Sequence, residues 1–128
     1  MSKRILAVDD DENILNLEKA ILVQHGFEVA AALGAQEALK ALDRETFDLL
    51  LLDVVMPEMT GFELCRKIKA DARFKDMPVV FLTARGGGEA LAEGFESGGM
   101  MYIRKPFTAA KLLAVVGTML KSSEHGLL

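Results

Sequence analysis

The sequence predicts a three-layer α/β domain built on a parallel sheet of five strands. Five short apolar runs alternate along the chain with five stretches of helical periodicity, which is typical of repeated strand–helix units. The runs are almost continuously apolar, as in strands that are buried on both faces of a sheet. The 128 residues are enough for one domain of this kind and leave little room for a second.

The expected strands cover residues 4–8, 27–32, 47–52, 78–82 and 100–104, and the second of them shows the weakest pattern. Runs of this length are short for helices and fit strands in the interior of a sheet. The helices that connect parallel strands cross over in the right-handed sense, and this limits the possible topologies to a few.

The expected helices are defined by apolar residues at helical spacing. Ile14, Leu17 and Ile21 mark the first helix, and Gly26 follows it as a cap at its carboxyl end. The other four are marked by Ala38, Leu39 and Leu42, by Phe62, Cys65 and Ile68, by Leu91 and Phe95, and by Leu112, Leu113, Val116 and Leu120. Thr108 is the expected cap at the start of the last helix.

A single domain is expected over residues 1–121, with residues 122–128 as a tail or linker stub, because the helical pattern stops after Leu120. Gly86-Gly87-Gly88 predicts a flexible connection into the fourth helix. Because Gly94 also lies inside that helix, we expect it to be the most mobile of the five.

The composition argues against several classes of protein. A net charge of −4 does not favour binding to duplex nucleic acid, which usually requires a clustered basic face. No apolar run has the length of a membrane span, and the apolar start at residues 5–8 meets aspartates at once, unlike a signal peptide. The single cysteine excludes an internal disulfide. We therefore expect a cytoplasmic protein without a direct nucleic-acid or membrane partner.

Polar side chains follow four of the five expected strands. Asp9 and Asp10 come after the first strand, Asp53 after the third, Thr83 after the fourth and Lys105 after the fifth. In a parallel sheet these strand ends lie at one edge, where open α/β folds bind their ligands. One such residue carries little information, but three carboxylates, a hydroxyl and a lysine form a specific set.

This set of residues suits phosphoryl chemistry. Close carboxylates repel one another unless a cation lies between them, and oxygen ligands in an open site favour Mg²⁺. A lysine supplies positive charge and a threonine supplies a hydroxyl donor for phosphoryl oxygens. A carboxylate with a metal and a lysine beside it makes an aspartyl phosphate chemically reasonable.

The same residues stand in motifs that resemble response-regulator receiver domains of two-component signalling, including chemotaxis regulators. The motifs are Ile5-Leu6-Ala7-Val8-Asp9-Asp10, Leu52-Asp53-Val54-Val55-Met56-Pro57 with Gly61, Leu82-Thr83-Ala84 and Lys105-Pro106-Phe107. Their order and intervals match the family from about residue 3 to residue 120. The resemblance implies a flavodoxin-like (βα)5 sandwich whose parallel strands lie in the order 2-1-3-4-5.

The resemblance also implies the roles of the acidic residues. Asp53 would be the phosphoacceptor. Asp10 would bind Mg²⁺ directly and Asp9 largely through water, with Asp53 and the backbone carbonyl of Val55 as further ligands. A sensor histidine kinase or a histidine phosphotransfer protein would donate the phosphoryl group in a phosphorelay.

Other roles implied by the resemblance concern switching. Thr83 and Lys105 would contact the phosphoryl oxygens, and Tyr102 matches an aromatic residue that turns inward on activation. The Lys105-Pro106 bond resembles one that is cis in the family. The face formed by helix 4, strand 5 and helix 5 would then change its affinity for a downstream protein or output domain.

Val55 and Arg85 are candidate modulators of the lifetime of the acyl phosphate. In the family fold the side chains at these two positions flank the route of the attacking water. Valine has no polar atom with which to hold that water, and arginine could screen the phosphorus. From the sequence alone, an alternative is equally well supported: Val55 only packs against its neighbours, and Arg85 is only exposed to solvent.

Two other classes of function remain to be weighed. A haloacid-dehalogenase-like phosphatase would place its Asp-x-Asp motif on Asp9 and Asp11, but the chain is short for that fold and Asp53 would have no role. A structural interaction module that is never phosphorylated is the other alternative. Our expectation is a phosphoacceptor switch that is not an enzyme and has only self-phosphorylation and autodephosphorylation chemistry, with Mg²⁺.

Overall fold

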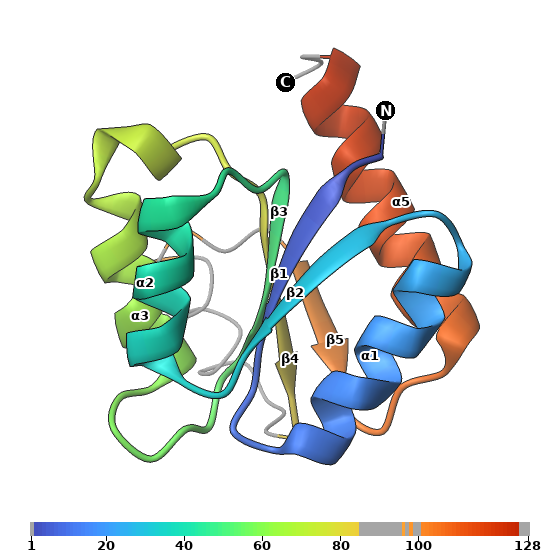
Figure 1. Cartoon of the computed structure of the whole chain (residues 1–128), viewed down its shortest axis with the longest axis horizontal. Coiled ribbons are helices and arrows are strands. Elements are labelled where there is room, and N and C mark those ends of the chain that lie inside the picture. The colour runs from blue at the N-terminus through green and yellow to red at the C-terminus, as the bar shows by residue number, and fades with distance from the viewer. Residues whose placement is uncertain (1, 85–95, 97, 99–100, 126–128) are drawn as a thin grey trace.

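Five parallel strands form one sheet in the order β2-β1-β3-β4-β5, which confirms the predicted fold class and strand order. The structure is a computed structural model that describes residues 2–84, 96, 98 and 101–125. The strands are β1 (Arg4–Val8), β2 (Glu28–Ala32), β3 (Leu49–Asp53), β4 (Val79–Thr83) and β5 (Met101–Arg104). Their carboxyl ends lie at a common edge of the sheet (Figure 1).

Helices cover both faces of the sheet (Figure 1). Helices α1 (Glu12–Gln24) and α5 (Ala109–His125) lie on one face, and α2 (Ala35–Arg44) and α3 (Gly61–Lys69) lie on the other. A 3₁₀ helix, η1 (Ala72–Phe74), follows α3. The fourth expected helix, with its glycines, Leu91 and Phe95, falls outside the described residues. None of the helices that the structure describes is long and apolar enough to cross a membrane.

The two faces have separate hydrophobic cores. Side chains of successive strand residues point to opposite faces, so Val79 and Phe81 pack towards α2 and α3, whereas Val80 and Leu82 pack towards α1 and α5. Strands β3 and β4 are buried throughout, as expected for the middle of a parallel sheet. This rigid centre positions the ends of both strands.

Helix α1 turns a different face to the core from the one that the sequence indicated. Its buried residues are Leu15, Glu18 and Leu22, whereas Leu17 is 48% exposed. The ends of the helix follow ordinary capping chemistry, because Asp11 accepts hydrogen bonds from two backbone N–H groups and Gly26 has φ +92° beyond the last turn. The interior position of Glu18 is the unexpected feature.

The last helix begins where the sequence predicts. The hydroxyl of Thr108 accepts a hydrogen bond of 3.0 Å from the backbone N–H of Lys111, which satisfies one free donor of the first turn. Helix α5 continues to His125, past the point where the apolar pattern stops. The boundary proposed at residue 121 remains a prediction.

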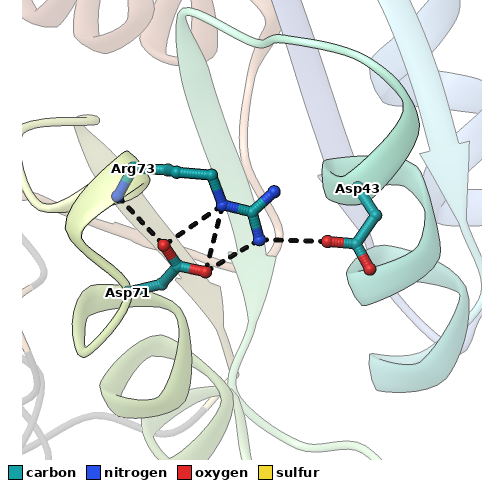
Figure 2. A network of polar contacts seen from close by, with 3 residues as sticks. All are labelled: Asp43, Asp71 and Arg73. Carbon is teal, nitrogen blue, oxygen red and sulfur yellow. Dashed lines mark hydrogen bonds and ion pairs between the residues drawn. The ribbon is translucent and has the colours of Figure 1, made fainter.

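An ion-pair network links α2 to the segment after α3 (Figure 2). The guanidinium of Arg73 donates hydrogen bonds to Asp71 and to Asp43, at 2.8 Å and 3.0 Å for the shortest contacts. Asp71 also caps η1 by accepting from the backbone N–H of Arg73. The network is exposed, so its contribution to stability is small and sensitive to salt.

Candidate functional site

The predicted site residues converge where four strands end. Asp9 directly follows β1, Asp53 is the last residue of β3, Thr83 is the last residue of β4, and Lys105 directly follows β5. The backbone N–H of Lys105 donates to the carbonyl of Thr83 at 2.9 Å, which continues the pairing of the two strands into the site. The order of the strands therefore brings together residues that are far apart in the sequence.

Three carboxylates form the acidic part of the site. Asp9, Asp10 and Asp53 each offer an oxygen atom, and these atoms lie within 4.8 Å of one another. Asp9 and Asp53 are buried, at 1% and 5% exposure, while Asp10 is exposed to solvent. The cluster is therefore open on one side and enclosed on the other.

Lys105 binds two of these carboxylates. Its Nζ atom donates to Oδ2 of Asp9 at 2.7 Å and to Oδ1 of Asp53 at 3.1 Å. Burial of the ammonium lowers the pKa of Lys105, but the hydrogen bonds to Asp9 and Asp53 outweigh this effect and the pKa rises above its usual value. The lysine therefore stays protonated and fixes a positive charge beside the strand ends.

The pKa of the Asp53 carboxyl is raised towards neutral pH. Burial and the charge of Asp9 raise its pKa to about 6, although Lys105 acts in the opposite direction. Above that pH the carboxylate is ionised, which a nucleophile requires. Asp53 can thus attack an electrophile at neutral pH while it keeps a hydrogen bond to the lysine.

The backbone around Asp53 is held by the start of α3. The N–H of Gly61 donates to the carbonyl of Val54 at 2.8 Å. A Cβ atom at Gly61 would lie 2.2 Å from the carbonyl oxygen of Asp53, closer than any real contact, so only glycine permits this approach. The capping box between Thr60 and Glu63 fixes the first turn of the helix in the same place.

The donor set fits a divalent cation. The available ligands are carboxylate oxygens, which hard ions such as Mg²⁺ prefer, and the exposed side of Asp10 leaves room for water ligands. Mutual repulsion within the cluster contributes to the raised pKa of Asp53. A bound cation would relieve that repulsion, so the residues present are compatible with the predicted metal.

The structure describes most of the remaining predicted residues. Thr83 is fully buried, and Tyr102 is half-buried on β5. Val55 follows β3 in a loop and is 54% exposed. The Lys105-Pro106 peptide bond is cis, as the resemblance to receiver domains implies. Arg85 lies outside the described residues, so its predicted effect on lifetime remains a prediction, as do the functional roles of the others.

Glu18 lies near the site although no sequence motif pointed to it. This residue of α1 is only 2% exposed, and its carboxyl makes no hydrogen bond or ion pair to any described residue. Burial, together with the charge of Asp9, raises its pKa to about 8, with Lys105 acting in the opposite direction. Its spacing of three and four residues from Leu15 and Leu22 is a sequence signal that places it beside these two leucines, although packing decides which stripe of the helix is buried.

Comparisons with known proteins agree with this geometry. The profile of the response regulator receiver domain matches residues 5–117. Response regulator PleD of Caulobacter vibrioides is 40% identical over 119 residues, which cover 93% of this chain and 26% of PleD. The nisin biosynthesis regulatory protein NisR of Lactococcus lactis subsp. lactis is 36% identical over 125 residues, which cover 98% of this chain and 53% of NisR. This chain thus spans about half or less of these relatives.

A solved structure shares the whole architecture. The crystal structure of a CheY-like response regulator receiver domain protein from Methanospirillum hungatei JF-1 matches with a TM-score of 0.92 at 34% identity. The match covers 98% of this chain and 99% of that chain. The fold and the order of the strands are therefore those of CheY-like receivers.

The expectation that this chain is not an enzyme is wrong. The profile that matches residues 5–117 describes receiver domains, and these phosphoacceptors also have a weak catalytic activity in removing their own phosphoryl group. The expectation treated the acceptance and loss of a phosphoryl group as chemistry distinct from enzyme catalysis. Carboxylates and a lysine, such as those that meet at the strand ends here, are groups of the kind that stabilise charge in phosphoryl transfer, and such stabilisation is catalysis.

Sequence, fold and site geometry lead to one assignment. The profile match extends over most of the chain, and the curated relatives are at least 36% identical. Asp9, Asp53 and Lys105 meet at the strand ends, as the receiver motifs require. The chain belongs to the response regulator receiver domain family of two-component signalling.

Proposed function

We propose that this chain is a phosphorylation-dependent signalling switch that receives a phosphoryl group on Asp53. The observation that carries the proposal is the hydrogen bond between Asp53 and Lys105 within the acidic cluster. Asp53 lies at the end of a central strand and carries an ionisable carboxyl, and the positive charge of Lys105 is fixed beside it. The donor would be a sensor histidine kinase or a histidine phosphotransfer protein acting in the cytoplasm.

The proposed reaction is an in-line transfer of the phosphoryl group. A carboxylate oxygen of Asp53 attacks the phosphorus of a phosphohistidine, the new O–P bond replaces the P–N bond, and the leaving imidazole takes up a proton. Lys105 holds Asp53 in position and offers charge to the phosphoryl oxygens. Bound Mg²⁺, held by the three aspartates and the carbonyl of Val55, would neutralise further charge on these oxygens.

The proposed readout starts at Thr83, whose hydroxyl would contact the phosphoryl group. Thr83 lies at the end of β4, and Tyr102 lies on the neighbouring strand β5. Their repositioning would alter the face formed by helix 4, β5 and α5, which would bind a downstream protein or an output domain. Val55 and Arg85 would set the lifetime of the acyl phosphate within this cycle.

The proposal is tested by replacing Asp53 with asparagine, which keeps the size of the side chain and removes the nucleophile. With acetyl phosphate and Mg²⁺, we expect the parent protein to gain one alkali-labile phosphoryl group and Asp53→Asn to gain none. Asp76→Asn, at an exposed site outside the cluster, is the matched control and should behave as the parent. Mass spectrometry that located the acyl phosphate on another aspartate of the parent would overturn the assignment.

A further inference from the structure

Three aromatic rings meet on the face of the sheet that packs against α3. Phe62 comes from α3, Phe81 from β4 and Tyr102 from β5. The ring centroids of Phe62 and Phe81 are 5.0 Å apart in an edge-to-face arrangement, and that of Tyr102 lies 5.8 Å from Phe81 and 6.4 Å from Phe62. These separations are in the range where aromatic pairs attract one another.

The contact between Phe81 and Tyr102 is built into the pairing of the strands. The two residues are direct partners in the register of β4 and β5, and both side chains lie on the same face of the sheet. Phe81 also shares this face with Thr83, which is two positions further along β4. The tyrosine ring is therefore neighbour to the strand segment that ends at the site.

Phe62 connects the rings to the phosphoacceptor by a second route. It directly follows Gly61, whose backbone approaches the carbonyl oxygen of Asp53 too closely for any side chain. A shift of the backbone at Asp53 would therefore displace the start of α3 and the ring of Phe62 with it. Phe62 and Phe81 are 0% and 1% exposed, so neither ring can move without disturbing its neighbours.

We propose that Phe62 and Phe81 are positioning residues for Tyr102, whose partly buried ring they hold against the sheet. Their rings form an aromatic seat, which sets how often Tyr102 is turned inward before any phosphoryl group is present. The inference rests on the proposed function, because it supplies a determinant of the same switch. Aromatic attraction of this kind shifts a two-state equilibrium by about two- to tenfold, which is enough to tune a switch.

The composition of the chain makes this inference accessible to a simple measurement. Tyr102 is the only tyrosine and the sequence contains no tryptophan, so tyrosine fluorescence reports on this one ring. Collisional quenching by acrylamide measures how often the ring is reached by solvent. The parent protein is compared with Phe81→Met and Phe62→Met, which remove a ring while nearly conserving side-chain volume.

We expect each methionine variant to raise the acrylamide quenching constant by about twofold, because the tyrosine ring loses a partner and turns outward more often. Phe27→Leu is the control, since Phe27 packs in the opposite core layer, and its quenching constant should equal that of the parent. Equal quenching constants in the parent and both methionine variants would overturn the proposal that Phe62 and Phe81 position Tyr102. An equal rise of the quenching constant in Phe27→Leu would also overturn it, because that result would indicate a general loosening of the fold.

The same samples separate the seat from the switch. Addition of Mg²⁺ and beryllofluoride, a phosphoryl mimic, should lower the quenching constant of the parent and lower it less in Phe81→Met. If the parent does not respond while the variants still differ without the mimic, the seat stands and the proposed function fails. If neither variant folds, cross-relaxation between the Tyr102 and Phe81 ring protons of the parent decides, and its absence would overturn the seat.

Discussion

Asp53 and Glu18 are carboxylic acids buried close to the same lysine, but their surroundings give them different protonation states. Asp53 accepts a hydrogen bond from Lys105, and its pKa of about 6 leaves it ionised at neutral pH. Glu18 has no such partner among the described residues, and burial raises its pKa to about 8. At neutral pH one acid is therefore ionised and the other is a neutral part of the core, because their environments differ.

Glu18 should make the protein less stable as the pH rises. Its pKa increases from an ordinary 4.5 in the unfolded chain to about 8 in the folded protein. A raised pKa contributes stability that is fully present below pH 4.5 and is lost as the pH rises through 8. Summed over that range, the loss is roughly 5 kcal/mol. Urea unfolding of Glu18→Leu as a function of pH should show a much flatter profile than the parent.

The raised pKa of Asp53 acts in the same direction, so Glu18→Leu should retain part of the pH dependence. Glu58→Leu is the control, because Glu58 is exposed and replacing it should leave the slope unchanged. Parallel profiles for the parent and Glu18→Leu would contradict a protonated, buried Glu18. The comparison of slopes is robust to any constant effect of leucine on stability.

At the scale of secondary-structure elements, the start of α3 is as important for the site as the strand ends. Its glycine allows the first turn to touch the backbone of Asp53, and the capping box of Thr60 and Glu63 holds that turn in place. The helix thus fixes the backbone from which the side chain of Asp53 projects. The next residue, Phe62, extends the same contact into the aromatic cluster.

Two glycine-to-alanine substitutions distinguish the contact of Gly61 with the Asp53 backbone from the general preference of helices for alanine over glycine. Gly61→Ala should destabilise the fold by roughly 2–4 kcal/mol, because its Cβ would strike a backbone oxygen that cannot move independently. Gly117→Ala in α5 meets no atom within 4 Å and should stabilise by up to about 1 kcal/mol. Denaturant unfolding measures both, and a neutral Gly61→Ala would show that α3 does not press on Asp53.

The strands and the core of the site were predictable from the sequence because they depend on local patterns. Each apolar run became a strand within two residues of its expected ends, and the polar residues at the ends of four of them necessarily lay at the sheet edge. The buried stripe of helix α1 was harder to predict, because Ile14, Leu15, Leu17, Ile21 and Leu22 form one broad apolar arc that covers a little less than half of its circumference. Within that arc the helical period fits a stripe along Ile14, Leu17 and Ile21 as well as one along Leu15 and Leu22. Only packing selects the second stripe, which includes Glu18.

The aromatic cluster could not be predicted for a related reason. Its rings come from three elements, and their separation depends on the register of β4 with β5 and on the position of α3. Sequence patterns predict whether a residue is buried but not which residues it contacts. Tertiary packing therefore determines contacts that the resemblance to a family leaves open.

In the molecule as a whole, acidic groups gather at one edge of a sheet whose interior is apolar. Three aspartates share that edge, and Lys105 is the cation that binds two of them directly. The geometry suits phosphoryl transfer, but the concentration of negative charge opposes folding. Any cation that binds only the folded site should therefore increase global stability.

Mg²⁺ should raise the melting temperature, and more so at higher pH. A ligand at one hundred times its dissociation constant stabilises the folded state by about 2.7 kcal/mol. Protons compete for the same oxygens, so the effect should weaken as the pH falls through the Asp53 pKa of about 6. Asp10→Asn should abolish most of the shift, whereas Asp76→Asn should keep it. Calorimetric scans with potassium chloride at equal ionic strength separate binding from screening, and an equal shift with either salt would argue against a specific Mg²⁺ site.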